Sequence, residues 1–450
     1  MVTRRELLSL LPAVLTAQPS GAAARLIEAS LRDTAAWRKL NYLCRRIGHR
    51  LSGSPGLTRA IDWAAAEMSK DGLVNVRKLA VMTPHWVRGE ESAYAIAPER
   101  RKLIMLGYGG SEATPAPGIE AEVAVVRSFE ELQRIGRGGV EGRIVVYNVP
   151  FAEAEYRFDG YSKTAQYRTE GASRAAALGA VASLTRSLTP ASRRTAHTGA
   201  MRYDPAHPKI PAAAISIDDA EWLAAMATAG RSVRVRLKMS ARRLPDASSA
   251  NVIGELRGRE RAEEVVVVGG HLDSWDAGQG AHDDGSGCVA AMQAVAMMRR
   301  LSLVPRRTVR VVLWTNEENG TAGAAAYRQW IGDDIRNHFA AIEMDMGAER
   351  PIGFGCSLDV ARPSLDEVGR WLEPVGAGQR LQRGGGTDLG PLMSAGVPGF
   401  WPVPSARRYF DWHHSAADVI GSVDLDDFRR NLAVVAVLAH GLADMPGKLV

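Results

Sequence analysis

The stretch VVVVGGHLDSWDAGQGAHDDGSG, residues 265–287, decides the fold and contains a dense group of acidic and histidine side chains. Its first four residues are β-branched and apolar, and the run is too short for a globular helix, so we expect a strand covered on both faces. Six histidine and aspartate residues follow, His271, Asp273, Asp276, His282, Asp283 and Asp284, before an Ala/Met-rich segment with helical character. Strand, polar loop and helix in this order are typical of an α/β sheet, whose functional loops lie at the carboxyl ends of the strands.

The composition is that of an ordinary globular protein and excludes several classes. The 450 residues, 46% hydrophobic and 24% charged, leave room for two or three domains. A net charge of +6 is mild for this length, and no Lys/Arg block carries interleaved aromatic residues, so we expect no nucleic-acid partner. The cysteines at positions 44, 288 and 356 have no CxxC spacing, which indicates buried free thiols rather than disulfides or a zinc knuckle.

The N-terminus has the pattern of an export signal. Arg4 and Arg5 precede the apolar run Leu7–Thr16, and small residues follow. An ordinary first helix is the alternative, but Pro12 interrupts the run, which is also too short to span a bilayer. We therefore predict a signal at residues 1–24 and a periplasmic or extracellular protein, with the paired arginines indicating twin-arginine export. No later run of about eighteen apolar residues occurs, so no integral membrane segment is expected in the mature protein.

The rest of the chain divides into three stretches. Residues 25–112 begin with an amphipathic helix, predicted over Ala24–Gly48, and continue with a helix and strands. The linker-like TPAPG of residues 114–118 opens residues 113–240, which alternate short strand and helix patterns and contain no convergent His/Asp/Glu set. We predict one α/β domain made of residues 25–112 and 241–450, with a mostly parallel mixed sheet sandwiched by helices. A second α/β domain is inserted at residues 113–240, and the two ends of this insertion should lie close together.

Candidate metal ligands stand at four successive predicted strand ends in the last stretch: His271, Glu317-Glu318, Asp345 and His413-His414, with Asp283 in the loop after the first. The last of these strands, Val397–Val403, contains Pro398 and Pro402, which predicts that it is short or at a sheet edge. Imidazole and carboxylate groups together suit zinc and related divalent ions. Five such groups with one shared carboxylate are the number needed for two adjacent ions.

Several motifs taken together resemble a known family. They are GGHLDSWDAGQGAHDDGSG from residue 269, WTNEENG from 314, EMDMG from 343, GGGTDLGPLMSAGVPG from 384 and YFDWHHSAAD from 409, supported by RLSGSPGL from 50 and PHWVRGEESA from 84. In content and order they resemble the co-catalytic zinc aminopeptidases and carboxypeptidases, in particular their plasma glutamate carboxypeptidase-like branch. The resemblance covers most of residues 40–440, and the inserted segment is similar to a protease-associated domain.

The resemblance implies a centre with two zinc ions, whose ligands also suit other divalent metals. Asp283 would bridge the ions with one carboxylate oxygen toward each. His271 and Asp345 would complete one site, and Glu318 and His414 would complete the other.

Two further acidic residues receive roles from the same resemblance. Glu317 would face the water between the ions and act as general base, because adjacent residues that leave a strand point in different directions. Asp273 would accept the second N–H of His271 and fix its tautomer. The peptide bond after Asp283 is commonly cis in the family, so we expect a cis bond here.

Three assignments rest on weaker patterns. Of the adjacent His413 and His414 we choose His414, because the family's ligand is followed by a small hydroxyl residue and, four positions on, by an aspartate. His282 departs from the family, which usually has a small or apolar residue there, and it either lines the pocket or is an incidental surface histidine. Thr387 and Asp388 either contact polar groups of the substrate or form a structural turn.

The predicted function is an exported metalloexopeptidase that cleaves dipeptides or short peptides with a metal-activated water. The residues do not separate carboxypeptidase, aminopeptidase and dipeptidase activity, since these differ in which peptide terminus the pocket holds. Two alternatives stay open: a receptor-like homologue without catalysis, and a dinuclear hydrolase of non-peptide amides. The relatives form homodimers, which implies a homodimer here by analogy alone.

Overall fold

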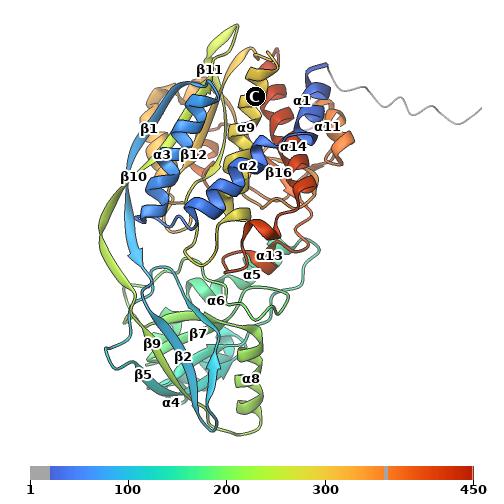
Figure 1. The fold of residues 1–450 in the computed structure, drawn as a ribbon. Coiled ribbons are helices and arrows are strands. Elements are labelled where there is room, and N and C mark those ends of the chain that lie inside the picture. Colours follow the sequence, from blue (N-terminus) through green and yellow to red (C-terminus); the bar gives the residue numbers. More distant parts are fainter. Residues whose placement is uncertain (1–20, 359–362, 448, 450) are drawn as a thin grey trace, which may run out of the picture.

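The computed structural model describes residues 21–358, 363–447 and 449, which form two α/β lobes (Figure 1). We call them the upper lobe and the lower lobe after their places in that view. Residues 1–20 of the predicted export signal lie outside the described residues, and residues 21–24 begin helix α1 (Gly21–Leu31). None of the described helices is both long and apolar enough to cross a membrane.

The upper lobe is built on an eight-stranded mixed sheet. Its order is β1 (Val74–Val87), β10 (Arg242–Leu256), β12 (Arg307–Trp314), β11 (Arg261–His271), β13 (His338–Glu343), β16 (Gly399–Pro404), β14 (Pro351–Cys356) and β15 (Arg380–Leu381). The four strands β12, β11, β13 and β16 run parallel, while β10 and β14 flank them in the opposite direction. The apolar run of residues 265–268 lies in β11, between two parallel neighbours, as its β-branched composition predicts.

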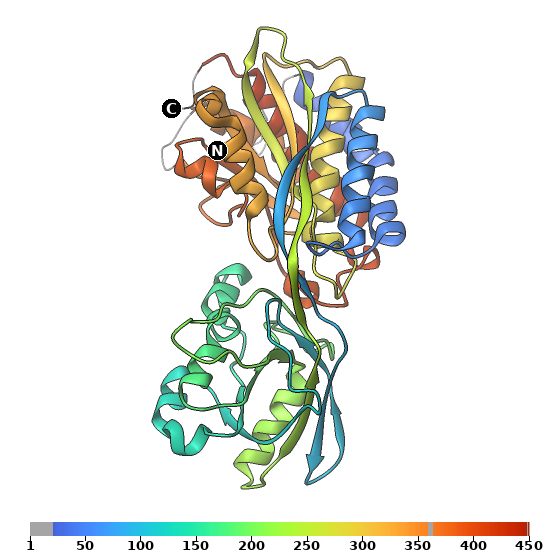
Figure 2. The same ribbon diagram turned by 90° about the vertical axis from the view of Figure 1, so that its left-hand side faces the viewer.

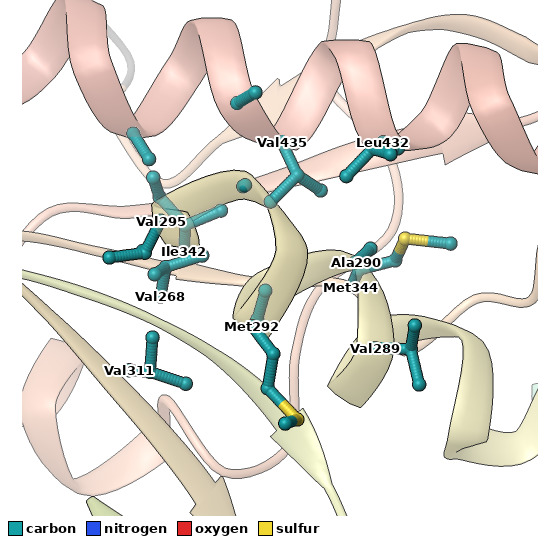
Figure 3. Packing of buried hydrophobic residues seen from close by; sticks show 14 of the residues in the cluster. Val268, Val289, Ala290, Met292, Val295, Val311, Ile342, Met344, Leu432 and Val435 are labelled. Atoms are coloured by element: carbon teal, nitrogen blue, oxygen red, sulfur yellow. The ribbon is translucent and has the colours of Figure 1, made fainter. Parts of the chain in front are cut away.

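Helices cover both faces of this sheet. One face carries α1, α2 (Ala35–Tyr42), α3 (Pro55–Lys70), α9 (Ser286–Arg300) and α14 (Leu425–Asp444), with α11 (Pro363–Leu372) packed against α14. Figure 3 shows Met292 and Val295 of α9 between the strand residues Val268 and Val311 and Val435 of α14. The other face is covered by α10 (Ala322–Ile331) and α12 (Gly390–Ser394). The predicted helix–sheet–helix fold is confirmed.

One local prediction is wrong, and another is confirmed for length but not for position. The helix expected over Ala24–Gly48 is interrupted after Leu31, where the Asp33 carboxylate accepts the Ala36 N–H at 2.7 Å and starts α2. The strand with two prolines is short but lies inside the sheet, between β13 and β14. It pairs with β13 only through Gly399 and Phe400, so the missing N–H of Pro402 falls beyond that ladder.

The lower lobe contains the second eight-stranded sheet. Its order is β3 (Arg101–Leu103), β2 (Glu91–Ala97), β9 (Arg234–Met239), β5 (Ile119–Val126), β6 (Ile144–Tyr147), β7 (Ala182–Arg186), β8 (Ala212–Ile215) and β4 (Met105–Gly107). Helices α4 (Phe129–Val140) and α7 (Gly171–Ala177) pack on one face and α8 (Ile217–Thr228) packs on the other. The short helices α5 (Arg157–Thr164) and α6 (Gln166–Thr169) lie at the junction with the upper lobe (Figure 1).

The two lobes are joined by β1 and β10, which run antiparallel from the upper sheet toward the lower lobe (Figure 2). Val87 pairs with Arg242, so the chain leaves and re-enters the upper lobe at adjacent points. The lower sheet also takes in β2, β3 and β4, residues 91–107, which precede the expected start of the insertion at residue 113. They belong there because β2 pairs with β9 along nearly its whole length.

Candidate metal centre

The predicted metal ligands come from the carboxyl ends of three neighbouring strands and from two loops, of which the one after β11 carries Asp283. His271 ends β11, Glu317 and Glu318 follow β12, and Asp345 follows β13. His413 and His414 do not directly follow a strand, because the short helix α13 (Tyr409–Trp412) separates them from β16.

One group of possible ligands surrounds His271. Its Nε2 atom lies 3.1 Å from Asp283 Oδ1 and 3.1 Å from Asp345 Oδ1. The ligand atoms of these three residues all lie within 4.8 Å of one another, and the His271 and Asp283 side chains are buried. An imidazole and two carboxylates that converge in this way could hold one divalent ion.

A second group lies on the other side of Asp283. His414 Nε2 is 3.1 Å from Glu318 Oε2 and 3.3 Å from Asp283 Oδ2. His413 stacks on His414 with ring centroids 3.6 Å apart, and its Nε2 is 3.6 Å from Asp283 Oδ2. The contact with Glu318, which is recorded for His414 alone, favours His414 over His413 as the ligand, while both histidines remain within reach of Asp283.

The chemistry of the two groups fits divalent cations. Asp283 Oδ2 is buried and accepts no hydrogen bond from the described residues, which is costly for a carboxylate oxygen unless an ion binds it. Burial raises the pKa of Glu318 to about 8, and the charge of Asp283 adds to this effect. Burial also raises the pKa of Asp345 to about 6, against the attraction of His271. Crowded, buried carboxylates of this kind are stabilised when cations lie between them.

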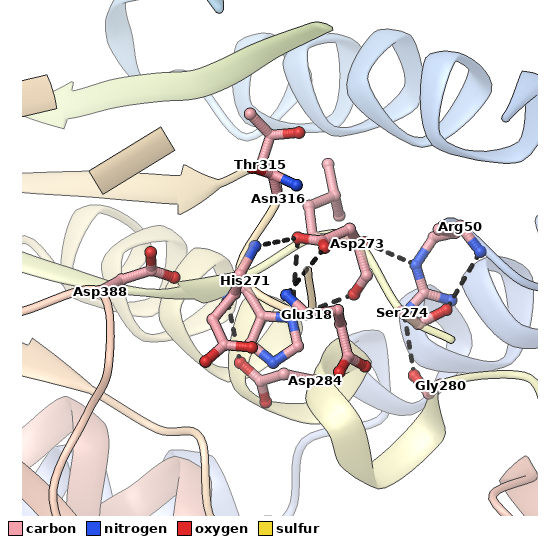
Figure 4. Close-up of polar contacts among 12 residues, drawn as sticks. Arg50, His271, Asp273, Ser274, Gly280, Asp284, Thr315, Asn316, Glu318 and Asp388 are labelled. Atoms are coloured by element: carbon pink, nitrogen blue, oxygen red, sulfur yellow. Dashed lines mark hydrogen bonds and ion pairs between the residues drawn. The ribbon is translucent and has the colours of Figure 1, made fainter. Parts of the chain in front are cut away.

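The structure corrects the predicted role of the Asp273 side chain. His271 Nδ1 donates to the backbone carbonyl of Asp273 at 3.1 Å, whereas the nearer carboxylate oxygen, Oδ1, is 3.8 Å away. The Asp273 carboxylate instead accepts the backbone N–H groups of Glu317 at 3.0 Å and Glu318 at 3.2 Å (Figure 4). Asp273 therefore fixes both the His271 tautomer and the loop after β12, through different groups.

Glu317 and Glu318 differ in burial and in their contacts. Glu318 is buried, with Oε1 accepting the Trp275 N–H at 3.1 Å and Oε2 facing His414. Glu317 is only half-buried, and its charge contributes, after burial, to the raised pKa of Asp345. Its carboxylate thus lies near the first group without belonging to it, which suits a proton-transfer role.

Three predicted substrate contacts have different outcomes. His282 neither lines a pocket nor lies on the surface: it is 1% exposed, stacks on Trp412, and its Nδ1 accepts the Ala348 N–H at 3.2 Å. Thr387 is exposed, and its carbonyl accepts the Gly390 N–H in a turn. Asp388 is buried beside the site (Figure 4), and neither of its carboxylate oxygens has a hydrogen-bond partner among the described residues.

Two buried charges that were not singled out from the sequence hold the loop before Asp283. Arg50 donates to the carbonyls of residues 48, 272, 279 and 280. Figure 4 shows Arg50 beside the last of these, Gly280. Asp418 accepts the backbone N–H groups of residues 281, 282 and 283 at 3.1, 2.8 and 3.2 Å. Arg50 lies in the RLSGSPGL motif and Asp418 ends YFDWHHSAAD, so the motifs marked both, but nothing local showed what they bind.

The residue after Asp283 also has a structural role. Asp284 Oδ2 accepts the His271 N–H at 3.1 Å, and Oδ1 accepts the Gly287 N–H at 3.0 Å at the start of α9. The peptide bond between Asp283 and Asp284 is cis, as expected from the resemblance. The Asp284 carboxylate therefore links the end of β11 to α9, while the Asp283 carboxylate faces His271 with one oxygen and His414 with the other.

Comparison with known proteins identifies relatives over almost the whole chain. Residues 251–439 match the family model described as Peptidase family M28. Carboxypeptidase Q of Bos taurus is 43% identical over 411 residues, covering 91% of this chain and 85% of that protein. Carboxypeptidase Q of Homo sapiens is 42% identical with the same coverage.

Solved structures agree with this similarity. A peptidase M28 precursor from Shewanella amazonensis SB2B has a TM-score of 0.91 and 33% identity, covering 95% of this chain and 97% of that chain. The aminopeptidase from Aneurinibacillus sp. strain AM-1 has a TM-score of 0.66 at 18% identity, covering 95% of this chain and 98% of that chain. The second similarity is one of fold.

Proposed function

The chain belongs to peptidase family M28, and we propose from this premise that it is a zinc exopeptidase whose centre holds two ions. We assign His271 and Asp345 to one ion, Glu318 and His414 to the other, and Asp283 to both. One observation carries the assignment. The two carboxylate oxygens of Asp283 face two different histidines, Oδ1 at 3.1 Å from His271 and Oδ2 at 3.3 Å from His414.

The protein's own residues then supply the proton transfers and the orientation. When bound, the two ions would lower the pKa of a water and polarise the scissile carbonyl. Glu317 takes a proton from the attacking water and delivers it to the leaving amine, so that no covalent acyl-enzyme forms. Asp273 holds Glu317 in place by accepting its backbone N–H at 3.0 Å. The same carboxylate holds Glu318, so the base and one ligand keep a fixed separation.

The substrates we propose are dipeptides or short peptides. The lower lobe supports this size limit, because its residues pack against the loop that carries His413 and His414: the Tyr161 ring centroid lies 4.9 Å from that of His413. The relatives are named carboxypeptidase Q, and the substrate panel described below tests which terminus of the peptide this protein recognises.

Two properties of the protein outside the site belong to the same proposal. We propose export on the signal predicted at residues 1–24, to a periplasmic or extracellular location. We also propose that the mature protein forms a homodimer. N-terminal sequencing of the protein recovered from its own host tests the export. Size-exclusion chromatography with light scattering tests the homodimer.

The experiment that tests the function is hydrolysis by zinc-loaded protein and by Glu317→Gln. We expect the Gln variant to lose about 10²- to 10⁴-fold in kcat, because a neutral amide cannot accept the proton of the attacking water. Glu263→Gln, an exposed glutamate of the upper lobe, is the matched control and should keep full activity. Full activity in Glu317→Gln would contradict the mechanism.

The substrate panel separates the remaining alternatives. It contains a free dipeptide, its N-acetyl form, its C-terminal amide and an acylated amino acid without a peptide bond. Loss of hydrolysis on N-acetylation indicates recognition of the amine, and loss on amidation indicates recognition of the carboxylate. Cleavage of the acylated amino acid alone would favour the amidohydrolase, and no cleavage of any member would favour the receptor-like homologue.

A further inference from the structure

A short segment of the lower lobe, residues 195–199, lies directly against the loop that carries His414. The Thr198 N–H donates to the His414 carbonyl at 2.8 Å, and His197 forms a bridge of antiparallel type with Ser415. The ring of His197 adds a further hydrogen bond, from Nδ1 to the His413 carbonyl at 2.7 Å. Its Nε2 lies 3.0 Å from Thr195 Oγ1, so the ring is held at both nitrogens.

The same segment contacts the functional end of His414. The Nδ1 atom of His414 is 3.3 Å from the Thr198 carbonyl, which can only accept a hydrogen bond. Donation from Nδ1 leaves Nε2 without its proton and directed at Glu318 and Asp283. A histidine that binds a metal needs such an acceptor for its second nitrogen, and here the acceptor belongs to the other lobe.

The space around this contact admits no side chain at residue 199. Gly199 has φ +137°, and a Cβ atom there would lie 2.9 Å from His414 Nδ1 and 2.3 Å from Arg168 Nη1. The two nitrogens are therefore no more than about 5 Å apart, with the glycine backbone filling the gap. The lower lobe thus meets His414 at a close-packed surface rather than at an open gap.

Further contacts dock the neighbouring residues on the lower lobe. Arg193 binds the Asp411 carboxylate at 2.8 Å, and Asp411 is buried. Phe158 of α5 stacks on Tyr409 with ring centroids 5.2 Å apart. The segment from Tyr409 to Ser415 is therefore held at several points, including both ends, by residues of the lower lobe.

We propose that the lower lobe contributes to metal binding by orienting His414, with His197 and Thr198 as the positioning residues. This inference rests on the proposed function, because it concerns the ion assigned to Glu318 and His414. It predicts that substitutions in this part of the lower lobe lower the affinity for that ion selectively. The ion assigned to His271 and Asp345 should keep its affinity, since the contacts of His197 and Thr198 are with the loop of His413 and His414 rather than with those two ligands.

The test measures metal binding directly, by competition of zinc-loaded protein against a chromophoric chelator of known affinity. We expect the wild type to bind two ions and His197→Ala to bind one of them about 10- to 100-fold more weakly, with the other unchanged. His197→Asn, whose amide N–H can replace the Nδ1 donor, should restore most of the affinity. His207→Ala changes a half-buried histidine of the same lobe and is the matched control.

A second pair of variants makes the test independent of the folding of His197→Ala. Gly199→Ala places a methyl group against His414 Nδ1 and should weaken the same ion, whereas Gly138→Ala adds one where no atom lies within 4 Å. A wild type that binds no divalent ion would sink the proposed function and this inference with it. The inference alone would be overturned if the wild type binds two ions and the folded His197→Ala and Gly199→Ala variants bind both of them as tightly as the wild type. It would also be overturned if these variants lose affinity for both ions equally.

Discussion

Arg50→Lys tests the hydrogen bonds by which the buried Arg50 side chain holds the loop that leads to Asp283. Arg50 is completely buried, and its guanidinium donates to four backbone carbonyls, those of Gly48 at 2.9 Å, Leu272 at 2.7 Å, Gln279 at 2.7 Å and Gly280 at 2.9 Å. The acceptors come from three separate parts of the chain. Only a planar group with donors on three nitrogens can serve them all from one position.

The expected loss of stability follows from counting the carbonyls that lysine abandons. A lysine ammonium keeps the charge but donates from a single atom, so it can reach about two of the four acceptors. Each buried carbonyl left without a partner costs about 1 to 3 kcal/mol, so two of them predict a loss of about 2 to 6 kcal/mol in the free energy of unfolding.

Urea unfolding followed by tryptophan fluorescence measures this loss as a shift of the transition midpoint at constant slope. Arg45→Lys, an exposed arginine five residues earlier, is the matched control and should shift stability by less than about 0.5 kcal/mol. If Arg50→Lys is as stable as this control, the four hydrogen bonds do not hold the loop and the reasoning is refuted.

Two further predictions concern metal and pH. A chelator should abolish hydrolysis and lower the unfolding temperature, and added zinc should restore both. The reason is that a ligand at about 1,000 times its Kd stabilises the folded state by about 4 kcal/mol. An unfolding temperature that does not respond to zinc would contradict this prediction. Burial lowers the pKa of His338, far from the centre, to about 4, so the unfolded chain takes up this proton first as pH falls below 6.5. Stability should drop by about 2 kcal/mol more between pH 7 and pH 5 in the wild type than in His338→Gln, and equal drops would refute the assignment.

The strands and the residues at their ends were predictable because the signals are local. A β-branched run such as residues 265–268 must be covered on both faces, and the parallel neighbours of such a strand end at the same edge of the sheet. His271, Glu318 and Asp345 could therefore be expected to meet before any coordinates existed. Their convergence from residues up to 74 positions apart is a consequence of sheet topology, not of any motif alone.

What could not be predicted depends on contacts between distant segments. Asp273 was expected to serve His271 two residues away, but its carboxylate binds N–H groups 44 and 45 positions further on. His282 reads like a polar residue of a functional loop, yet its ring is buried against Trp412, whose position only the fold defines. The role of Arg50 could not be predicted, because three of its four carbonyl acceptors lie more than 200 residues away in the sequence.

The lower lobe reaches the centre from two sides, and this limits how the lobes can move. On one side His197 and Thr198 hold the His414 loop. On the other, Arg88 at the end of β1 binds both carboxylate oxygens of Asp276, at 2.5 and 2.9 Å, in the loop between His271 and Asp283, while it also donates to the Gly107 carbonyl of the lower lobe. A rotation that opened the lobes about the β1–β10 crossing would break one of these attachments and pull a loop of the centre with it.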